Sequence, residues 1–414
     1  MQHSQTLGID FGTSNSAVGF MCGAVPRLVE LSPGQTTLPT AFFFDFETRK
    51  TLMGQAANDA LTDGLEGRYM RALKRVLGQP IMHEKRRILN ETVSFVEIIA
   101  RFLAHIKERA EAVSGQQFNR VLSGRPVHFH DGDSALDQRA EDDLRLCYEA
   151  AGFTEISFMS EPVAAAISVR RPLPISSLGL VVDIGGGTSD FTVFEAADEG
   201  GVNVIASHGI RIGGTDFDKA ISIDHVMPLL GKGTQLKNHL GQGRLVAPNT
   251  IFNELSTWEK IPFIYSSETT ALVADMHKYA VEPAKFKRLV TTLQYQLGHD
   301  IAFAVEQGKM DANSVSQEAA IDLGVVEAGL ASCLSADAMN ASIVKDVAAI
   351  KACAIEALQM AGITKGQISR IVFVGGSSLT LAVSDALKQA FPNAEYVFEE
   401  VFTAVANGLT IAAK

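Results

Sequence analysis

Apolar residues recur in this chain at the three- and four-residue spacing of amphipathic helices, and short apolar runs that end in glycine separate these stretches. Three helices are predicted, each ending at a glycine: residues 96–110 before Gly115, residues 134–148 from a Ser134 cap to Gly152, and residues 343–358 before Gly362. An apolar strand at 371–374 follows the third helix and ends in Gly375-Gly376. Strands and helices that alternate in this way predict an α/β protein.

One sequence plan occurs twice. GIDFGTSNSAVGF (8–20) and VDIGGGTSDFTVF (182–194) share an apolar strand, an aspartate, a glycine turn, Thr-Ser and a second apolar strand. Their aspartates, Asp10 and Asp183, are 173 residues apart. Two hairpins of one design predict two related lobes that face each other across a cleft.

Glycine at a hairpin turn exposes backbone N–H groups that can cradle a phosphate, because glycine tolerates positive φ and has no side chain in the way. An isolated Asp-x-Gly-Thr is equally typical of an ordinary tight turn. Three glycines in a row after the apolar strand 180–182 weaken a sheet, however, and so favour phosphate binding. Asp10 and Asp183 are predicted to hold Mg²⁺ through water beside these turns.

Length and composition limit the classes of function. At roughly 150 residues per domain, 414 residues predict two or three packed units, and 46% hydrophobic residues exclude a disordered or collagen-like chain. The chain has 47 acidic and 36 basic residues, a net charge of −11, and no basic block longer than Lys85-Arg86-Arg87. A nucleic-acid partner is therefore not expected.

The remaining composition points to the cell interior. Four cysteines are dispersed without CxxC spacing, which predicts reduced, packed thiols rather than zinc ligands or disulfides. The start has no cationic and apolar leader, and no apolar stretch approaches the ~18 residues of a membrane span. We expect a soluble, cytoplasmic protein with no membrane partner.

The order of motifs resembles the nucleotide-binding domain of the heat shock protein 70 (DnaK-type) family, in the actin/hexokinase/heat-shock ATPase superfamily. Besides the hairpins, similar segments carry Lys74, Pro126, Arg139 and Glu161, and further ones are at 37–44, 213–218, 374–378 and 405–409. The resemblance implies an α/β, two-lobed actin-like ATPase fold of duplicated ribonuclease H-like domains, with a nucleotide cleft between the lobes. It covers residues 8–409.

The expected lobes are residues 1–175, completed by a C-terminal helix at about 385–414, and residues 176–384. The stretch 226–287 lacks clear periodicity and holds the single tryptophan, Trp258, so we expect an elaborated subdomain at about 219–310. The 88 residues from Asp218 to Glu306 exceed the usual family segment, which places recognition by exchange factors in doubt. The sequence stops at Lys414, so we expect a stand-alone ATPase domain without a peptide-binding domain, or a piece of a longer chain.

The resemblance also implies roles for single residues. Lys74 acts near the γ-phosphate and the attacking water, while Glu161, Asp183 and Asp190 order the nucleophile and the Mg²⁺ waters, and Thr188 contacts the phosphates. ATP or ADP is expected to contact Gly12, Thr13, Ser14, Asn15, Gly185, Gly186, Gly187, Thr188, Gly213, Gly214, Glu306, Lys309, Met310, Gly375, Gly376, Ser377 and Leu379. From the residues alone, Lys74 could equally lie on a solvated face and Glu161 at a plain helix N-terminus.

The base site departs from the family pattern. Glu306 and Lys309 keep the implied ribose contacts, but Met310 and Leu379 replace two arginines that sandwich adenine in the family. The loss of two cation–π contacts predicts weak selectivity for adenine.

The favoured function is an ATP-binding, slowly ATP-hydrolysing chaperone-like domain that changes conformation for an unidentified protein partner. A small-molecule, sugar-type kinase is the alternative; it needs a general base, for which Asp131 and Asp133 are the candidates. A filament-forming actin-like protein is the third hypothesis.

Overall fold

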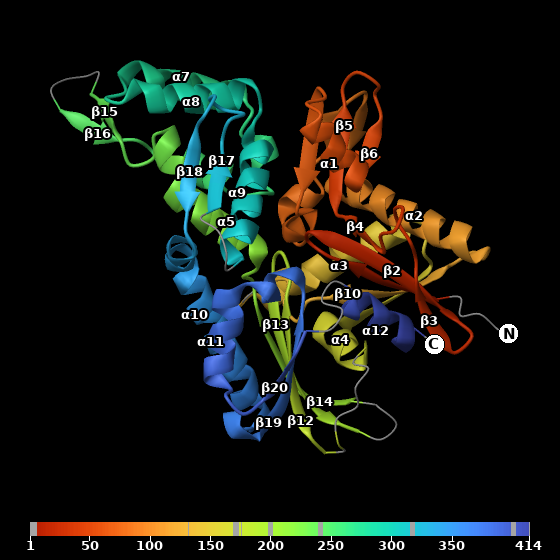
Figure 1. Ribbon diagram of the computed structural model, residues 1–414. Helices are drawn as coiled ribbons and strands as arrows, with labels where there is room; N and C mark the ends of the chain where they lie inside the picture. The colour runs from red at the N-terminus through yellow and green to blue at the C-terminus, as the bar shows by residue number, and fades with distance from the viewer. Residues whose placement is uncertain are drawn as a thin grey trace. The chain divides into compact units, whose positions relative to one another are not determined.

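The computed structural model describes residues 6–130, 132–168, 174, 176–197, 202–238, 243–314, 319–398 and 403–413 (Figure 1). The chain forms two compact units, one of Met1–Gly214 with Val347–Lys414 and one of Thr215–Asp346. These two compact units do not correspond to the predicted lobes, 1–175 with 385–414 and 176–384. The division into lobes remains a prediction.

Two sheets in the first unit repeat one topology. The first sheet has the order β11-β10-β1-β2-β3, with β4 paired to β2; the second has the order β20-β19-β12-β13-β14. In both, the central strand pairs in parallel on one side and antiparallel on the other. The bounds are β1 Thr6–Phe11, β2 Asn15–Cys22, β3 Val25–Leu28, β4 Thr37–Pro39, β10 Arg120–Arg125, β11 Glu155–Ser160, β12 Leu178–Ile184, β13 Ser189–Ala196, β14 Val202–Ile210, β19 Ile368–Val374 and β20 Glu395–Val397. The two matching sequences form the equivalent hairpins β1–β2 and β12–β13, so the internal repeat is structural.

A helix follows the last strand of each sheet and packs on the other sheet. Helix α4 (Glu161–Ser168) follows β11 and packs on β12 and β13, whereas α12 (Ala404–Ala412) follows β20 and packs on β1 and β2. The two helices also pack on each other around buried Ala164 and Leu409. Glycines permit the approach to the sheet, since a Cβ on Gly8 would lie 2.5 Å from the backbone nitrogen of Thr410.

The three predicted helices are confirmed. Helix α2 (Phe95–Ser114) begins with a capping box of Ser94 and Glu97, and α10 (Ala336–Ala361) ends before Gly362 at φ 68°. Helix α3 (Ser134–Ala150) corrects one detail of the prediction. Its cap is Asp133, whose carboxylate accepts the Leu136 N–H, so the predicted cap Ser134 is already the first helical residue.

Smaller elements complete the first unit, including a sheet of order β6-β5-β7; the segment 37–44 contributes β5 to this sheet and β4 to the first sheet. Their bounds are β5 Ala41–Asp45, β6 Thr51–Met53, α1 Gln55–Thr62, β7 Gly67–Arg71, the 3₁₀ turns η1 Leu73–Val76 and η2 Pro80–Met82, β8 Arg86–Ile88, β9 Glu91–Val93, η7 Lys365–Gln367, η8 Gly376–Leu379 and α11 Leu381–Ala390.

The second unit begins within α5 (Gly214–Ile221), at Thr215, and is largely helical. It contains the π-helical turn η4 Ser222–Val226, η5 Met227–Leu230, β15 Gln235–Lys237, β16 Arg244–Val246, α6 Thr250–Leu255, η6 Ile261–Phe263, α7 Ser267–Tyr279, α8 Pro283–Gln294, α9 Gly298–Asn313, β17 Ala319–Asp322 and β18 Ala331–Leu334. Helix α7 shows why the periodicity here is weak, because only Val273 and Met276 are buried along it.

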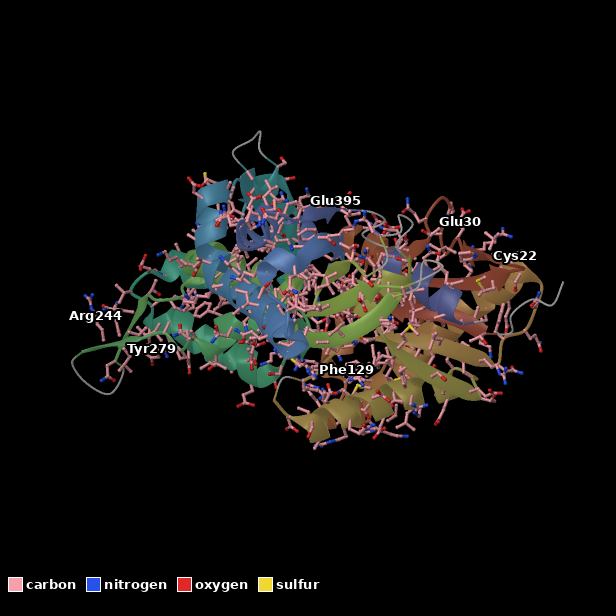
Figure 2. The ribbon with its side chains drawn as sticks, turned by 90° about the horizontal axis from the view of Figure 1, so that it is seen from below. Cys22, Glu30, Phe129, Arg244, Tyr279 and Glu395 are labelled. Carbon is pink, nitrogen blue, oxygen red and sulfur yellow. The ribbon has the colours of Figure 1, made fainter. Side chains whose placement is uncertain are left out.

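The prediction of packed thiols is half wrong. Cys147 and Cys353 are buried, but Cys22 lies exposed at the end of β2 (Figure 2) and Cys333 is on the outward-facing side of β18. Among the described residues, no helix has the length and apolar character that crossing a membrane requires.

Candidate functional site

The turns of the two equivalent hairpins touch each other. A Cβ on Gly186 would overlap Ser14 Oγ, and one on Gly187 would lie 2.9 Å from Thr13 Oγ1. The Gly185 N–H closes its own turn by donating to the Thr188 carbonyl at 3.0 Å. This close approach brings together the two turns that the sequence repeat predicts, and a side chain at 186 or 187 would displace the hydroxyl groups of Ser14 and Thr13.

Two more glycine segments pack against the second hairpin. The Gly214 N–H donates to the Gly185 carbonyl at 3.0 Å, and a Cβ on Gly213 would lie 2.6 Å from the backbone nitrogen of Gly187. Gly375, at φ 77°, passes so close to the end of β12 that a Cβ would lie 2.8 Å from Asp183 Oδ1. Four backbone segments, far apart in sequence, therefore converge on one spot.

A buried ion pair lies among carboxyl groups at this spot. Lys74 Nζ donates to Glu161 Oε1, and Lys74 is only 7% exposed, which excludes the solvated-face interpretation. Lys74 is the second residue of η1, and η1 directly follows Ala72, which has φ 62°. Burial alone would lower the pKa of Lys74, but the charges of Glu161 and Asp10 outweigh burial and raise it. Lys74 thus stays an ammonium ion in the interior.

Three aspartates share this environment and retain protons unusually well. Burial, and then the charge of Glu161, raise the pKa of Asp10 to about 7 and that of Asp190 to about 8. The same two causes raise the pKa of Asp183 well above its usual range. With one ammonium group among four carboxyl groups, the site has an excess of acceptors that suits a cation.

The carboxyl group of Asp190 is held by a residue that follows the first sheet, Val127, and by a residue of its own hairpin, Thr188. Its Oδ1 accepts the Val127 N–H at 2.7 Å, and the Thr188 hydroxyl also bonds to it. Val127 follows Pro126, so one of the residues carried by the segments that resemble the family adjoins this contact. Arg139, which another of these segments carries, is an exposed residue of α3.

The residues expected at the nucleoside are on separate compact units. Glu306, Lys309 and Met310 are on α9, whereas Gly376, Ser377 and Leu379 form η8. Met310 is 52% exposed and Leu379 is 41% exposed. Lys309 is engaged within its own unit, because its Nζ pairs with Asp218 Oδ1 at 2.6 Å.
 The Lys309–Asp218 pair has a third partner that sequence reasoning did not connect to it. The Trp258 Nε1–H donates to Asp218 Oδ2 at 3.1 Å, and all three side chains are largely buried. Only the position of Asp218 in the segment 213–218 signalled a special role. The kinase hypothesis gains nothing here, since Asp133 caps α3 and Asp131 lies outside the described residues.

The site thus defines an α/β protein in which two equivalent hairpin turns meet beside a buried lysine and several carboxyl groups. Comparison of sequences gives the family, since the sequence model described as Hsp70 protein matches residues 6–321. The chain belongs to the Hsp70 family. Members have the two-lobed actin-like ATPase fold, so the fold class predicted from the sequence is confirmed.

Two curated relatives support this assignment. The chain is 26% identical over 399 residues to the chaperone protein DnaK of Mycoplasmoides gallisepticum (strain R(low / passage 15 / clone 2)), covering 91% of this chain and 63% of the relative. It is 28% identical over 391 residues to the chaperone protein DnaK of Ureaplasma urealyticum serovar 10 (strain ATCC 33699 / Western), covering 91% and 61%. The chain therefore spans about three fifths of the length of these relatives.

Proposed function

We propose that this chain binds ATP and ADP with Mg²⁺ and hydrolyses ATP slowly, as an Hsp70-like chaperone domain that changes conformation with the bound nucleotide. The observation that carries the proposal is the contact of the two hairpin turns, at Thr13 and Gly187, beside the buried Lys74–Glu161 pair. Family membership supports the ATPase class.

The hairpins supply the groups that phosphates need. The glycine-rich turns at residues 12–15 and 185–188 let a phosphate approach the backbone closely, and Thr13 and Thr188 add hydroxyl groups beside them. Because both turns contribute, a polyphosphate held here would contact both sheets at once. The conformation of the unit would then depend on which nucleotide is bound.

The carboxyl groups fit a magnesium ion held through water. Asp10 and Asp183 have raised pKa values, first through burial and then through the charge of Glu161, so a cation beside them would relieve an existing penalty. Within the described ranges, no three acidic, histidine or cysteine side chains are placed to ligate one ion directly. When bound, the ion supplies charge neutralisation for the phosphate oxygens.

Lys74 and Asp190 are suited to organise hydrolysis. Lys74 brings a fixed positive charge that Glu161 orients, which is the kind of preorganised group that stabilises charge on a transferred phosphoryl group. Asp190, held by Val127 N–H and Thr188, can hold a proton at neutral pH or orient a water molecule through its carboxyl oxygens.

The DnaK relatives are named as chaperones, and we extend this to a protein partner for the present chain. The contact of Asp190 with Val127 gives a route by which the nucleotide site could act on Pro126 and its surroundings. The partner would then sense the bound nucleotide. Ribose contacts from Glu306 and Lys309 complete the proposal, with Lys309 exchanging or sharing its bond to Asp218.

Calorimetric titration with ATP, with and without EDTA, tests the proposal. Asp183→Ala should abolish the metal-dependent part of the affinity, while the exposed Asp385→Ala should behave as wild type. Equal affinity with and without EDTA would refute the metal model. ATP consumption that requires an added sugar would favour the kinase alternative instead.

A further inference from the structure

The short segment that carries Lys74, residues 72–78, is held from outside by a set of side chains. It is bounded by two residues with positive φ, Ala72 at 62° and Gly78 at 81°. The backbone bonds within the segment, from Arg75 N–H to the Ala72 carbonyl at 3.0 Å and from Leu77 N–H to the Lys74 carbonyl at 3.4 Å, are local, so its placement depends on the groups that contact it from outside. The relevant side chains are those of Arg211, His130 and Asp143.

Arg211 links this segment to the second hairpin. Its Nη2 donates to the Arg75 carbonyl, next to Lys74, and its Nη1 donates to His130 Nδ1 at 3.0 Å. Arg211 precedes Gly213 by two residues, and Gly213 packs directly on Gly187. If the second hairpin moved, the side chain of Arg211 would therefore move the backbone next to Lys74.

His130 completes the link and must be neutral to do so. Arginine can only donate, so Nδ1 of His130 accepts the bond from Arg211. The other nitrogen, Nε2, therefore carries the proton and donates to the Leu77 carbonyl at 2.7 Å. Arg211 and His130 thus bind carbonyl groups on both sides of Val76.

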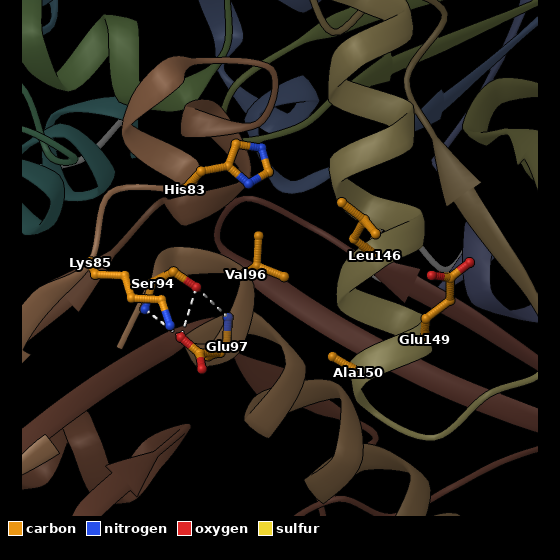
Figure 3. Close-up of a pocket in the computed structure, with 8 residues that line it drawn as sticks. All are labelled: His83, Lys85, Ser94, Val96, Glu97, Leu146, Glu149 and Ala150. Carbon is orange, nitrogen blue, oxygen red and sulfur yellow. Dashed lines mark hydrogen bonds between the residues drawn. The ribbon is translucent and has the colours of Figure 1, made fainter. Parts of the chain in front are cut away.

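Asp143 of α3 holds the end of the same segment. Its Oδ2 accepts the Gly78 N–H at 2.8 Å, and its Oδ1 accepts from His83 Nε2 at 2.8 Å. His83 also lines an open pocket of about 400 Å³ with Val96 and Leu146 (Figure 3). This anchor uses neither Arg211 nor His130.

We propose that Arg211 and His130 act as a positioning pair that holds Lys74 in register with the phosphate-binding hairpin. The inference rests on the proposed function, because the register matters only if Lys74 acts on a phosphate at Gly185–Thr188. Neither residue is a catalytic residue, since both act through the backbone of the Lys74 segment.

The pair should be sensitive to acid. Burial and the charge of Arg211 lower the pKa of His130, while the Leu77 carbonyl, Asp137 and Asp133 act in the opposite direction. The charged groups around the ring are thus Arg211, Asp133 and Asp137, with Arg75 on the segment itself. Because the pKa is lowered, protonation requires a pH further below the ordinary histidine value of 6.5; an imidazolium would then face the guanidinium, and the bond to Nδ1 would be lost.

Single-turnover hydrolysis with Arg211→Gln and His130→Asn tests the pair. Each variant should slow the step by about tenfold to a hundredfold while nucleotide affinity stays unchanged, because misplacing a reacting group costs rate rather than binding. The double variant should be no slower than the slower single one. Arg87→Gln, an exposed residue of β8, is the matched control and should match wild type. Additive losses, or a loss of affinity equal to the loss of rate, would overturn the proposal.

The pH profile gives a readout that a merely structural role would not change. The rate of hydrolysis should fall less on acidification in His130→Asn than in wild type, because asparagine does not titrate. In Arg87→Gln the rate should fall as much as in wild type. Identical profiles of wild type and His130→Asn would contradict the proposal.

A measurement without turnover separates this inference from the proposed function. Hydrogen exchange of the nucleotide-free protein should be faster for peptides covering 72–78 in Arg211→Gln, with no change across the α2 peptides. If exchange is unchanged, the positioning pair is wrong even when ATP is hydrolysed. If exchange changes but wild type neither binds nor hydrolyses ATP, the proposed function fails and the positioning pair fails with it as a device for hydrolysis.

Discussion

Gly408 of α12 and Ala164 of α4 are in backbone contact where the two helices cross. A Cβ on Gly408 would overlap the Ala164 carbonyl oxygen, so the crossing has no room for any side chain there. Both residues are buried, and the surrounding core includes Val181 of the second sheet and Leu409. The crossing therefore connects the cores beneath both sheets.

Gly408→Ala should reduce the free energy of unfolding by about 1–3 kcal/mol, the usual cost of forcing an extra methyl group into a packed core. Gly366→Ala is the matched control, because no atom lies within 4 Å of a Cβ there and its φ is not positive. Urea unfolding followed by circular dichroism would measure both. Equal stability of the two variants would show that the helices move apart at little cost.

The pKa of Asp190 predicts how stability depends on pH. In the folded protein it is raised to about 8, first by burial, from an ordinary value of 3.8. Between these values the native state binds more protons than the unfolded chain, so this group makes stability fall as pH rises. Asp190→Asn should flatten the slope by at most about 1.4 kcal/mol per pH unit.

Unfolding in EDTA, without nucleotide, from pH 4.5 to 7.5 measures this effect. Asparagine keeps the acceptor for the Val127 N–H, so the fold should survive. The exposed Asp142→Asn on α3 should leave the slope as in wild type. A slope in Asp190→Asn that matches wild type would mean that Asp190 is ionised in the folded protein.

Lys74→Ala should slow ATP hydrolysis by about a hundredfold or more while nucleotide affinity is largely kept, because the ammonium group is needed where charge develops. Single-turnover assays would show the loss, with the exposed Lys50→Ala as the control. Wild-type turnover in Lys74→Ala would rule out the assigned role.

The same variant tests the buried ion pair. Removing Lys74 leaves the Glu161 carboxylate buried without its partner, so stability should fall by about 3–5 kcal/mol. The double variant Lys74→Ala/Glu161→Gln should recover part of this lost stability, because neither position then carries a charge. Thermal unfolding of both variants would decide. A double variant that is less stable than Lys74→Ala would argue against this electrostatic account.

Met310 and Leu379 predict weak discrimination between ATP and GTP, since neither side chain offers a cation for the base to stack on. Met310→Arg/Leu379→Arg should tighten ATP binding by about 1–4 kcal/mol if both guanidinium groups stack on adenine. Competition titrations of ATP against GTP on wild type and the double variant measure both quantities. Strong adenine selectivity in wild type would refute the placement of these two residues at the base.

Some features were predictable from sequence because they depend on local chemistry. The ends of the helices at Gly115 and Gly362 and the two hairpins follow from glycine positions and apolar spacing, and all are present. The cap of α3 was assigned one residue late, since both Asp133 and Ser134 are good caps and only the fold shows which one reaches the Leu136 N–H.

Other features depend on contacts between distant residues. Glu161 is 87 positions from Lys74, and His130 is 81 positions from Arg211, so no local spacing connects either pair. The order of family motifs pointed to Lys74 and Glu161, but no motif pointed to His130 or Arg211. Burial could not be inferred for Lys74 either, because its neighbours in sequence include other basic residues.

The exchange of covering helices between the sheets has a consequence for synthesis on the ribosome. The hairpin β1–β2 is made well before the helix that covers it, since β2 ends at Cys22 and α12 begins only at Ala404. At about 5–20 residues per second, the hairpin waits roughly 20–80 s for its cover. During that interval the apolar strand around Ile9 is a surface that ribosome-associated folding factors could protect, so this member of a chaperone family would itself be a client while it is being made.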